Sequence, residues 1–503
     1  MNRREFLKLS ALASLPAIAP RSAPAAAPDN RPNILFLTSE DISPDFSCYG
    51  TPAVQTPNLD KLAADGIRFD NAFVAAPVCS ASRSAFSTGM YQTSIGAHQH
   101  RTARKQPLPE PVKPMYQLLK EAGYYTVLAG KTDFNYQWDP KAALSGTKDW
   151  SGRAPGQPFF CQMNFTVTHR AFKRDAEHPI DPNDVALSPA YADHPIIRRD
   201  FADCLESIQI MDRQVGDLLK RLDEEGIAEN TLVLFIGDHG QCMHRGKQFL
   251  YDDGIRIPMI ARWPRAIAPG QVRDELVSSI DIAATFLECA GVGTPDWMQG
   301  RPFLPADKTD RDAIFAARDR CDGTADRIRC VRTKEYKYIR NYYPDRPYTQ
   351  LNAYKEKSYP GLAVMKLLYS QGRLTPEQAH FFAPTRPAEE LYDLRADPHE
   401  LRNLADDPAC SDTLNALRAR LDAWIAETGD KGETPEDPEE EKRQYEKMAQ
   451  EYQNSLKQIG VAEGDLEGMV AYWEKRLAGG AETAKKARPN RAKSPDDSAA
   501  AAK

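Results

Sequence analysis

The chain lacks several features that would place it in other classes of protein. Beyond residue 30 it has no apolar run near the ~20 residues that cross a bilayer, which argues against a membrane-spanning segment. Its formal net charge is only -6, and nothing in its charge indicates a nucleic-acid partner. The nine cysteines form no CxxC pair, so neither zinc nor thioredoxin chemistry is indicated. No internal repeat is present, and a composition with 41% hydrophobic and 27% charged residues is typical of a globular enzyme.

The length and the N-terminus predict an exported protein with more than one domain. A single hydrophobic core stops growing at roughly 250–300 residues, so 503 residues favour one large domain and a smaller one. Arg3-Arg4, followed by a Phe-Leu-Lys run and a weakly apolar stretch, resembles a twin-arginine export signal. We therefore expect residues 1–29 to be a signal peptide and the mature protein to be periplasmic or extracellular. The sequence leaves open whether Cys321 and Cys330 pair there.

Short apolar runs predict a catalytic domain over residues 30–310. Such runs are typical of strands that are buried on both faces. They occur at 33–38, 124–129, 159–166, 231–236 and 257–261, and alternate with helical patterns at 57–66, 115–123, 198–225 and 280–290. This alternation indicates an α/β fold with a mainly parallel sheet. Glu40-Asp41 and Asp238-His239 each follow a strand, so we expect them to meet at the carboxyl edge of the sheet.

The C-terminal part of the chain differs from the catalytic domain in its secondary-structure pattern and composition. Residues 311–430 predict a smaller α+β domain, with antiparallel strands near 313–316, 328–332, 337–340 and 390–394 and a helix at 412–428. Residues 431–480 are rich in Glu and Lys and predict a charged helical extension. Residues 481–503 have the composition of a disordered tail.

The segment Cys79-Ser80-Ala81-Ser82-Arg83, followed by Thr88-Gly89, carries the strongest chemical signal. It resembles the motif of the type I sulfatases, a family of the alkaline-phosphatase-like superfamily, with Ala81 where proline is more usual. The resemblance implies that a maturation enzyme oxidises Cys79 to formylglycine, whose hydrated aldehyde attacks sulfur. A helix pattern begins at residue 82, which would place the nucleophile at the positive end of a helix dipole and Arg83 one turn further on.

The same resemblance implies one Ca²⁺ ion. The family has two adjacent acids after its first strand, matched by Glu40-Asp41, and Asp followed by Asn or His after a later strand, matched by Asp238-His239. Carboxylates suit a hard cation such as Ca²⁺. Imidazole prefers softer ions, so His239 is either a ligand, a more distant neighbour of the metal or a contact of the nucleophile.

Cationic groups complete the resemblance, because sulfate transfer develops charge on oxygen. The family's pattern implies catalytic roles for Lys131, His169 and Lys247. Many relatives have a histidine two residues after the first lysine, where this chain has Asp133. We consider four residues as groups that replace it or bind substrate, namely His98, His100, Arg101 and His244. The resemblance covers residues 31–427 and is closest to the heparan N-sulfoglucosamine sulfohydrolase-like branch.

These residues predict a hydrolase of sulfate esters or sulfamates on sulfated carbohydrates. The fold that the resemblance implies is an alkaline-phosphatase-like sandwich with a smaller C-terminal α+β domain. Two alternatives remain open, a phosphodiesterase or phosphonate hydrolase on the same scaffold and a non-catalytic sulfoglycan-binding protein whose Cys79 stays unmodified. Rates on aryl sulfates and aryl phosphate diesters distinguish a sulfatase from a phosphodiesterase or phosphonate hydrolase. The mass of residue 79 distinguishes a sulfatase from a binding protein with an unmodified cysteine.

Overall fold

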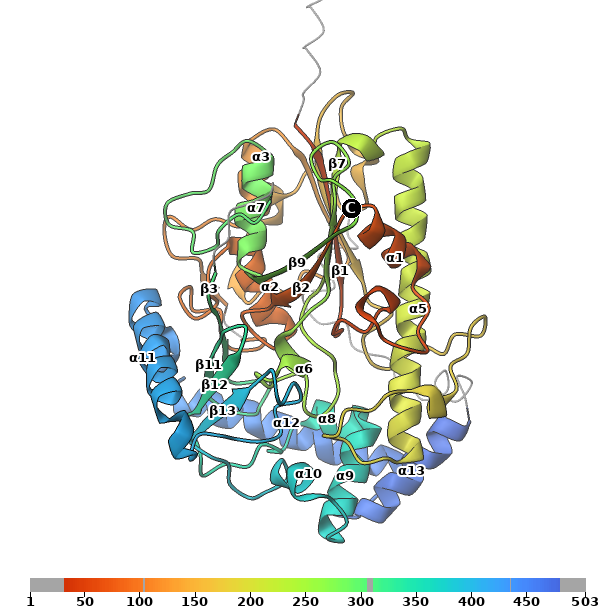
Figure 1. Cartoon of the computed structure of the whole chain (residues 1–503), viewed down its shortest axis with the longest axis vertical. Coiled ribbons are helices and arrows are strands. Elements are labelled where there is room, and N and C mark those ends of the chain that lie inside the picture. The colour runs from red at the N-terminus through yellow and green to blue at the C-terminus, as the bar shows by residue number, and fades with distance from the viewer. Residues whose placement is uncertain (1–30, 103–104, 305–310, 435, 480–503) are drawn as a thin grey trace, which may run out of the picture. The chain divides into compact units, whose positions relative to one another are not determined.

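The computed structural model describes residues 31–102, 105–304, 311–434 and 436–479 (Figure 1). The expected signal peptide at 1–29 and the expected tail at 481–503 lie outside these residues. None of the described helices is both long and apolar enough to span a bilayer.

A seven-stranded sheet forms the centre of the fold, in the order β4-β6-β1-β7-β8-β2-β9. Its strands are β1 (Asn33–Ser39), β2 (Ile67–Phe73), β4 (Tyr125–Ala129), β6 (Phe159–Phe165), β7 (Thr231–Gly237), β8 (Met259–Arg262) and β9 (Gln271–Ser278). All pairings are parallel except those of β8, which is antiparallel to both β7 and β2. The predicted α/β fold with a mainly parallel sheet is therefore confirmed.

Helices cover both faces of this sheet because successive strand residues point to opposite sides. In β1, Leu35 and Leu37 pack in the core under α1 (Pro57–Ala64) and α5 (Pro195–Glu224). Ile34 and Phe36 belong to the other core, which lies under α2 (Cys79–Thr88), α3 (Met115–Glu121) and α7 (Asp281–Cys289). The two helix layers flank the sheet (Figure 1).

A second, antiparallel sheet forms within residues 311–430, as predicted. It consists of β10 (Ile314–Arg318), β11 (Ile328–Arg332), β12 (Tyr336–Asn341) and β13 (Glu389–Asp393) in that order. Helix α11 (Ser411–Thr428) covers it, and Val331 and Tyr338 share a core with Leu421 and Trp424 of this helix.

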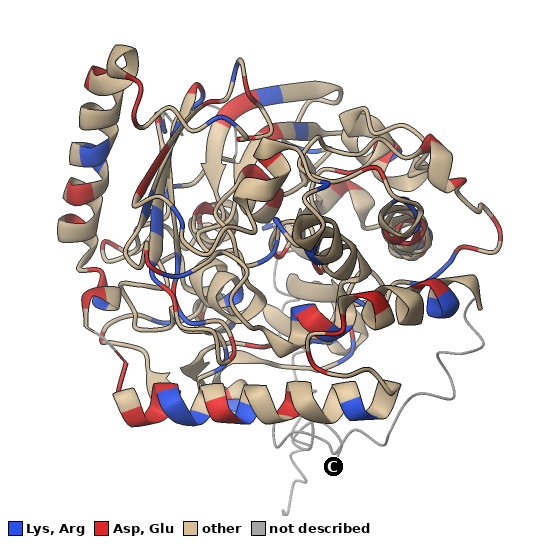
Figure 2. Ribbon diagram, turned by 90° about the horizontal axis from the view of Figure 1, so that it is seen from below, with Lys and Arg blue, Asp and Glu red and all other residues tan. Residues whose placement is uncertain are grey.

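Additional helices surround these sheets. The segment 341–388, between the third and fourth strands of the antiparallel sheet, contains α8 (Ala353–Ser358), α9 (Pro360–Ser370) and α10 (Pro376–His380). In the charged extension, α12 (Pro438–Ile459) packs on α8 and α13 (Leu466–Ala478) packs on α9. Charges of both signs are interspersed along the helices in Figure 2. Cys321 and Cys330 are both free, buried thiols.

Candidate active site

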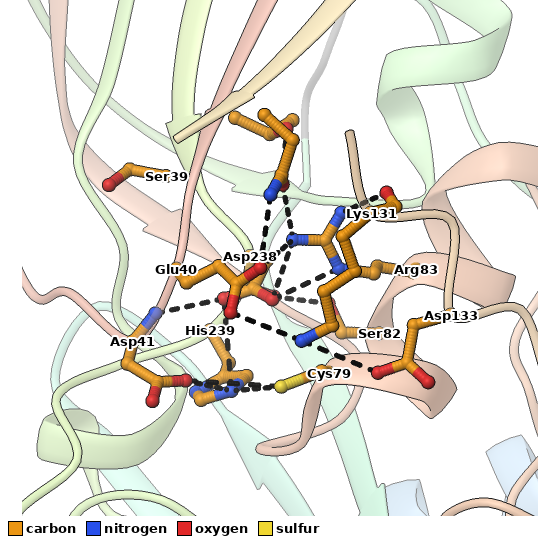
Figure 3. A network of polar contacts seen from close by, with 12 residues as sticks. Ser39, Glu40, Asp41, Cys79, Ser82, Arg83, Lys131, Asp133, Asp238 and His239 are labelled. Carbon is orange, nitrogen blue, oxygen red and sulfur yellow. Dashed lines mark hydrogen bonds and ion pairs between the residues drawn. The ribbon is translucent and has the colours of Figure 1, made fainter. Parts of the chain in front are cut away.

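The chemically active side chains gather at the carboxyl edge of the central sheet (Figure 3). Glu40 and Asp41 follow β1, and Asp238 and His239 follow β7, its parallel neighbour. The backbone N–H of Asp41 donates to Asp238 Oδ1 at 3.0 Å, which ties the two strand ends together. Two segments nearly 200 residues apart therefore deliver their carboxylates to one place.

Cys79 is the first residue of α2, and its buried thiol faces these strand ends. Its Sγ lies 3.2 Å from His239 Nε2, 3.4 Å from Lys247 Nζ and 3.9 Å from Asp41 Oδ1. At the first turn of a helix, backbone N–H groups point outward and favour a bound anion. The thiol thus has cationic groups on one side and the positive end of a helix on the other.

Three buried carboxylates are each paired with one cation. The ion pairs are Glu40–Lys131 at 3.1 Å, Asp41–Lys247 at 2.9 Å and Asp238–Arg83 at 3.0 Å. Arg83 also donates to Asn164 Oδ1 at 2.6 Å, and Asn164 Nδ2 donates to Glu40 Oε1 at 3.0 Å. The formal charges of these three pairs cancel, and His239, 2.9 Å from Asp41 and 3.7 Å from Asp238, adds a positive charge when protonated. A divalent cation bound among the carboxylates would therefore make the site more positive.

The ionisation of these groups follows from burial and from their neighbours. Burial opposes ionisation of Asp41, but Lys247 and His239 outweigh it and hold its pKa well below the usual value. The pKa of Asp238 is likewise lowered by His239 and Arg83 against the effect of burial. Burial lowers the pKa of His239, but Asp238, Cys79 and Asp41 outweigh it and raise this pKa to about 10. Asp41 and Asp238 are therefore charged near neutral pH.

The donor set fits a divalent cation. Asp41 Oδ2 is buried and has no hydrogen-bond partner within the described part of the chain. Such an atom carries a desolvation cost unless a ligand takes it up. Ligand atoms of Asp41, Cys79 and His239 lie within 4.8 Å of one another. Of these donors the carboxylate of Asp41 suits a hard ion, and the neighbouring carboxylate of Asp238, whose Oδ1 accepts from the Asp41 N–H, offers further oxygen ligands.

The rim of the site is partly exposed and carries further charge. His169 Nε2 lies 3.8 Å from Asp41 Oδ2, and its side chain is 28% exposed. Asp133 binds both Arg101, at 3.1 Å, and Lys131, at 3.4 Å, and the Arg101 side chain is 49% exposed. A substrate would therefore approach the thiol past His169, Lys131 and Arg101.

The other histidines named from the sequence do not contact Cys79. His100 Nδ1 lies 2.9 Å from the hydroxyl of Ser80, and burial together with Arg101 lowers its pKa to about 3. His244 packs against the rings of Tyr191, Phe381 and Phe382. His98 is half-buried and lies near Asp319 and Arg329. The structure therefore brings together all five predicted catalytic residues and all four predicted metal ligands, and places His98 and His244 elsewhere.

Sequence reasoning missed Asn164, which bridges Arg83 and Glu40, and it also missed an aromatic residue of this site. Tyr354 of α8 lies between two predicted catalytic residues, with Lys247 Nζ 5.2 Å from its ring centroid and the His169 ring at 5.9 Å. Its hydroxyl is buried and has no hydrogen-bond partner among the residues described. No motif surrounds Tyr354 in the sequence, so only the fold of the segment 341–388 could reveal it.

Left-handed backbone conformations cluster around the site. Asp41, Arg101, Asp133 and Gln248 have φ values of 57°, 57°, 50° and 79°. Residues other than glycine rarely adopt this region, which costs of order 1 kcal/mol or more each, and such strain gathers at functional sites. Tertiary contacts around the site therefore hold the backbone of these residues in a conformation that is unfavourable in isolation.

Comparison with known proteins agrees with this geometry. The sulfatase family model matches residues 32–143 and 135–292, and the model of the N-sulphoglucosamine sulphohydrolase C-terminal region matches residues 237–360. An ulvan-active sulfatase of Formosa agariphila is 35% identical over 460 residues, which cover 81% of this chain and 76% of that protein. Human N-sulphoglucosamine sulphohydrolase is 25% identical over 79% of this chain and 90% of its own length.

Solved structures show the same fold. A protein in complex with its substrate D-glucosamine-2-N,6-O-disulfate superposes with a TM-score of 0.59 and 18% identity, over 80% of this chain and 98% of that one. A phosphonate monoester hydrolase from Silicibacter pomeroyi superposes with a TM-score of 0.60 and 17% identity, over 80% and 96%. At these identities the likeness concerns the fold alone.

The chain belongs to the sulfatase family. It is a sulfuric ester hydrolase with the alkaline-phosphatase-like fold, and its relatives include N-sulphoglucosamine sulphohydrolase and ulvan-active sulfatases.

Proposed function

We propose that this enzyme hydrolyses sulfate esters or sulfamates of sulfated polysaccharides, with residue 79 as formylglycine and with one bound Ca²⁺. The observation that carries the proposal is the position of Cys79. Its Sγ lies within 4 Å of Asp41, His239 and Lys247, which three separate segments contribute. A structural cysteine would be buried among apolar groups, whereas this one faces buried charges.

The absent groups would supply two pieces of chemistry. Formylglycine at position 79, made by a maturation enzyme, would supply a hydrated aldehyde as the nucleophile for sulfur. Ca²⁺ held by Glu40, Asp41 and Asp238 would act as a Lewis acid on the sulfate oxygens.

The chain's own residues position the sulfate group, contact the nucleophile and supply a proton to the leaving group. Lys247 and Lys131 offer ammonium groups to the oxygens that become more negative during transfer. Arg83 orients Asp238 and Asn164, because its guanidinium binds both side chains. His239 Nε2 lies against residue 79 and, as an imidazolium, would donate a hydrogen bond to an oxygen of the nucleophile. The more exposed His169 is placed to protonate the leaving oxygen or nitrogen.

The relatives support a sulfated polysaccharide as the substrate, and ulvan is the first candidate because an ulvan-active sulfatase shares 35% identity with this chain. The positively charged approach past Lys131 and Arg101 suits a polyanion. The twin-arginine-like N-terminus supports export to the compartment where such polymers are degraded.

The test is sulfate release by enzyme co-produced with a formylglycine-generating enzyme. Defined ulvan and glycosaminoglycan oligosaccharides carrying O- or N-sulfate serve as substrates, and ion chromatography measures the product. Cys79→Ala should abolish release, whereas Cys410→Ala, at a half-buried cysteine of another region, should leave it unchanged. Hydrolysis of aryl phosphate diesters faster than of any sulfated substrate would contradict the proposal.

A further inference from the structure

A small cavity adjoins the active site on the side of Lys247. The two residues that follow this lysine, Gln248 and Phe249, belong to its wall. The cavity has room for about one group of the size of a water molecule. Its lining also includes polar and charged side chains, among them Arg318, Thr324, Gln350 and Lys355.

Two buried cations share one aromatic ring at this cavity. Lys355 Nζ lies 4.4 Å and Arg318 Cζ 5.4 Å from the centroid of Phe249. Lys355 Nζ donates to the carbonyl of His244 at 3.1 Å but forms no ion pair with any carboxylate of the described residues. Arg318 Nε is buried and lacks a hydrogen-bond partner in the same part of the chain, although another nitrogen of its guanidinium donates to Asp326.

The charges around this cavity do not balance. Asp326 accepts from Arg318 at 2.7 Å and also from Arg386 at 2.9 Å, so one carboxylate serves two guanidinium groups. The neighbouring Glu356 is already paired with Lys366. Lys355 therefore adds a further buried positive charge that no carboxylate neutralises. Burying a charge without a partner is costly, and hydrogen-bond donors buried without acceptors add to that cost.

We propose that this cavity, between Lys355 and Arg318, binds a small monovalent inorganic anion, for which chloride has the right charge and nearly the right size. The ion would accept from Lys355 Nζ and from Arg318 Nε, and it would neutralise one excess charge. Sulfate, the product of the enzyme, has four oxygens and is too large for a space of this size. The site is separate from the proposed nucleophile, because neither cation contacts Cys79.

The alternative is a cavity that holds only water, next to a lysine that has lost its proton. Burial and the nearby Arg318 lower the pKa of Lys355 well below its usual value, so a site without an anion would release the proton of this ammonium group. The two alternatives differ in one respect, because only the anion site responds to the identity of the salt.

The first experiment measures thermal unfolding of the full-length enzyme in sodium chloride and in sodium gluconate at equal ionic strength. We expect a midpoint about 1–2 °C higher in chloride, since a ligand that binds only the folded state raises its stability. Lys355→Met keeps the length of the side chain and removes the charge, so it should abolish the difference. Lys357→Met, at an exposed lysine of the same helix, should preserve it. An equal chloride effect in the wild type and in Lys355→Met would overturn the proposal, and so would no effect in the wild type.

A second experiment needs no variant. Crystals of the wild-type enzyme grown in sodium bromide should show an anomalous peak within hydrogen-bond distance of Lys355 Nζ and Arg318 Nε. Water alone at this position, with bromide ordered elsewhere in the crystal, would contradict the proposal even if Lys355→Met fails to fold. Neither outcome bears on sulfatase activity, so the anion site and the proposed function stand or fall separately.

Discussion

His239 Nε2 lies 3.2 Å from Cys79 Sγ, although 160 positions separate the two residues in the chain. The sequence left three roles open for this histidine, and the contact favours the one in which it faces the nucleophile. Asp133, which stands where many relatives have a histidine, instead binds Arg101 and Lys131 at the rim. We infer that His239 provides the contact with the nucleophile that a histidine at position 133 would otherwise provide.

Replacement of His239 by asparagine tests this role. His239→Asn keeps a polar group beside Asp238 but loses the charged contact with residue 79, so kcat should fall about 10²–10³-fold, as expected when a preorganised hydrogen-bond donor is removed from an active site. The affinity for Ca²⁺, measured by isothermal titration calorimetry, should change much less. A loss of Ca²⁺ affinity as large as the loss of kcat would show that His239 is primarily a metal ligand.

Removal of Asp41 should abolish stabilisation by calcium. If Ca²⁺ binds only the folded enzyme, a concentration of 100 times its Kd stabilises the fold by about 2.7 kcal/mol. The wild type should therefore melt at a higher temperature in calcium than in chelator, and Asp41→Asn should melt equally in both. Asp65→Asn, at a half-buried aspartate that pairs with Lys61 on the surface of α1, serves as the control and should keep the difference. A calcium effect that persists in Asp41→Asn would place the metal elsewhere.

Tyr354 should contribute through its ring. Tyr354→Ala removes the aromatic surface between Lys247 and His169, and the loss of the cation–π contact alone is worth about 1 kcal/mol, so kcat/KM should fall about 5-fold. Tyr354→Phe keeps the ring and should retain activity within about 2-fold, because the hydroxyl has no partner among the described residues. Equal activity of Tyr354→Ala and the wild type would remove this tyrosine from the active site.

Glu400 should make the stability of the fold depend on pH. Burial raises its pKa to about 7 against the effect of Lys337, with Asp252 adding to the rise. Since the folded-state pKa exceeds the unfolded one, its contribution to stability is fully present below the unfolded value of about 4.5 and is lost as pH rises toward 7. Relative to the wild type, Glu400→Gln should gain up to about 3 kcal/mol between pH 5 and pH 8.

Urea unfolding at these two pH values measures this gain. The exposed Glu229→Gln provides the control and should track the wild type at both values. A constant difference between Glu400→Gln and the wild type would mean that Glu400 does not titrate in this range.

The sequence predicted most of the central sheet because its strands are short and apolar on both faces. The acids directly after β1 and β7 could be placed at one edge because parallel strands end at the same edge of a sheet. Strands β2 and β9 were missed because neither is a continuous apolar run. Strand β2 has Arg68, Asp70 and Asn71 between its buried residues, and β9 alternates polar and apolar residues at the edge of the sheet. The role of Tyr354 could not be predicted from the sequence, because its position depends on how α8 packs and not on a local pattern.

The most direct measurement of the central claim is peptide mass spectrometry of residue 79, combined with sulfate release by the same sample. Enzyme produced with the maturation enzyme should carry oxygen in place of sulfur at this position, and activity should rise in proportion to the converted fraction. Full activity in a sample whose residue 79 is an unmodified cysteine would contradict the account.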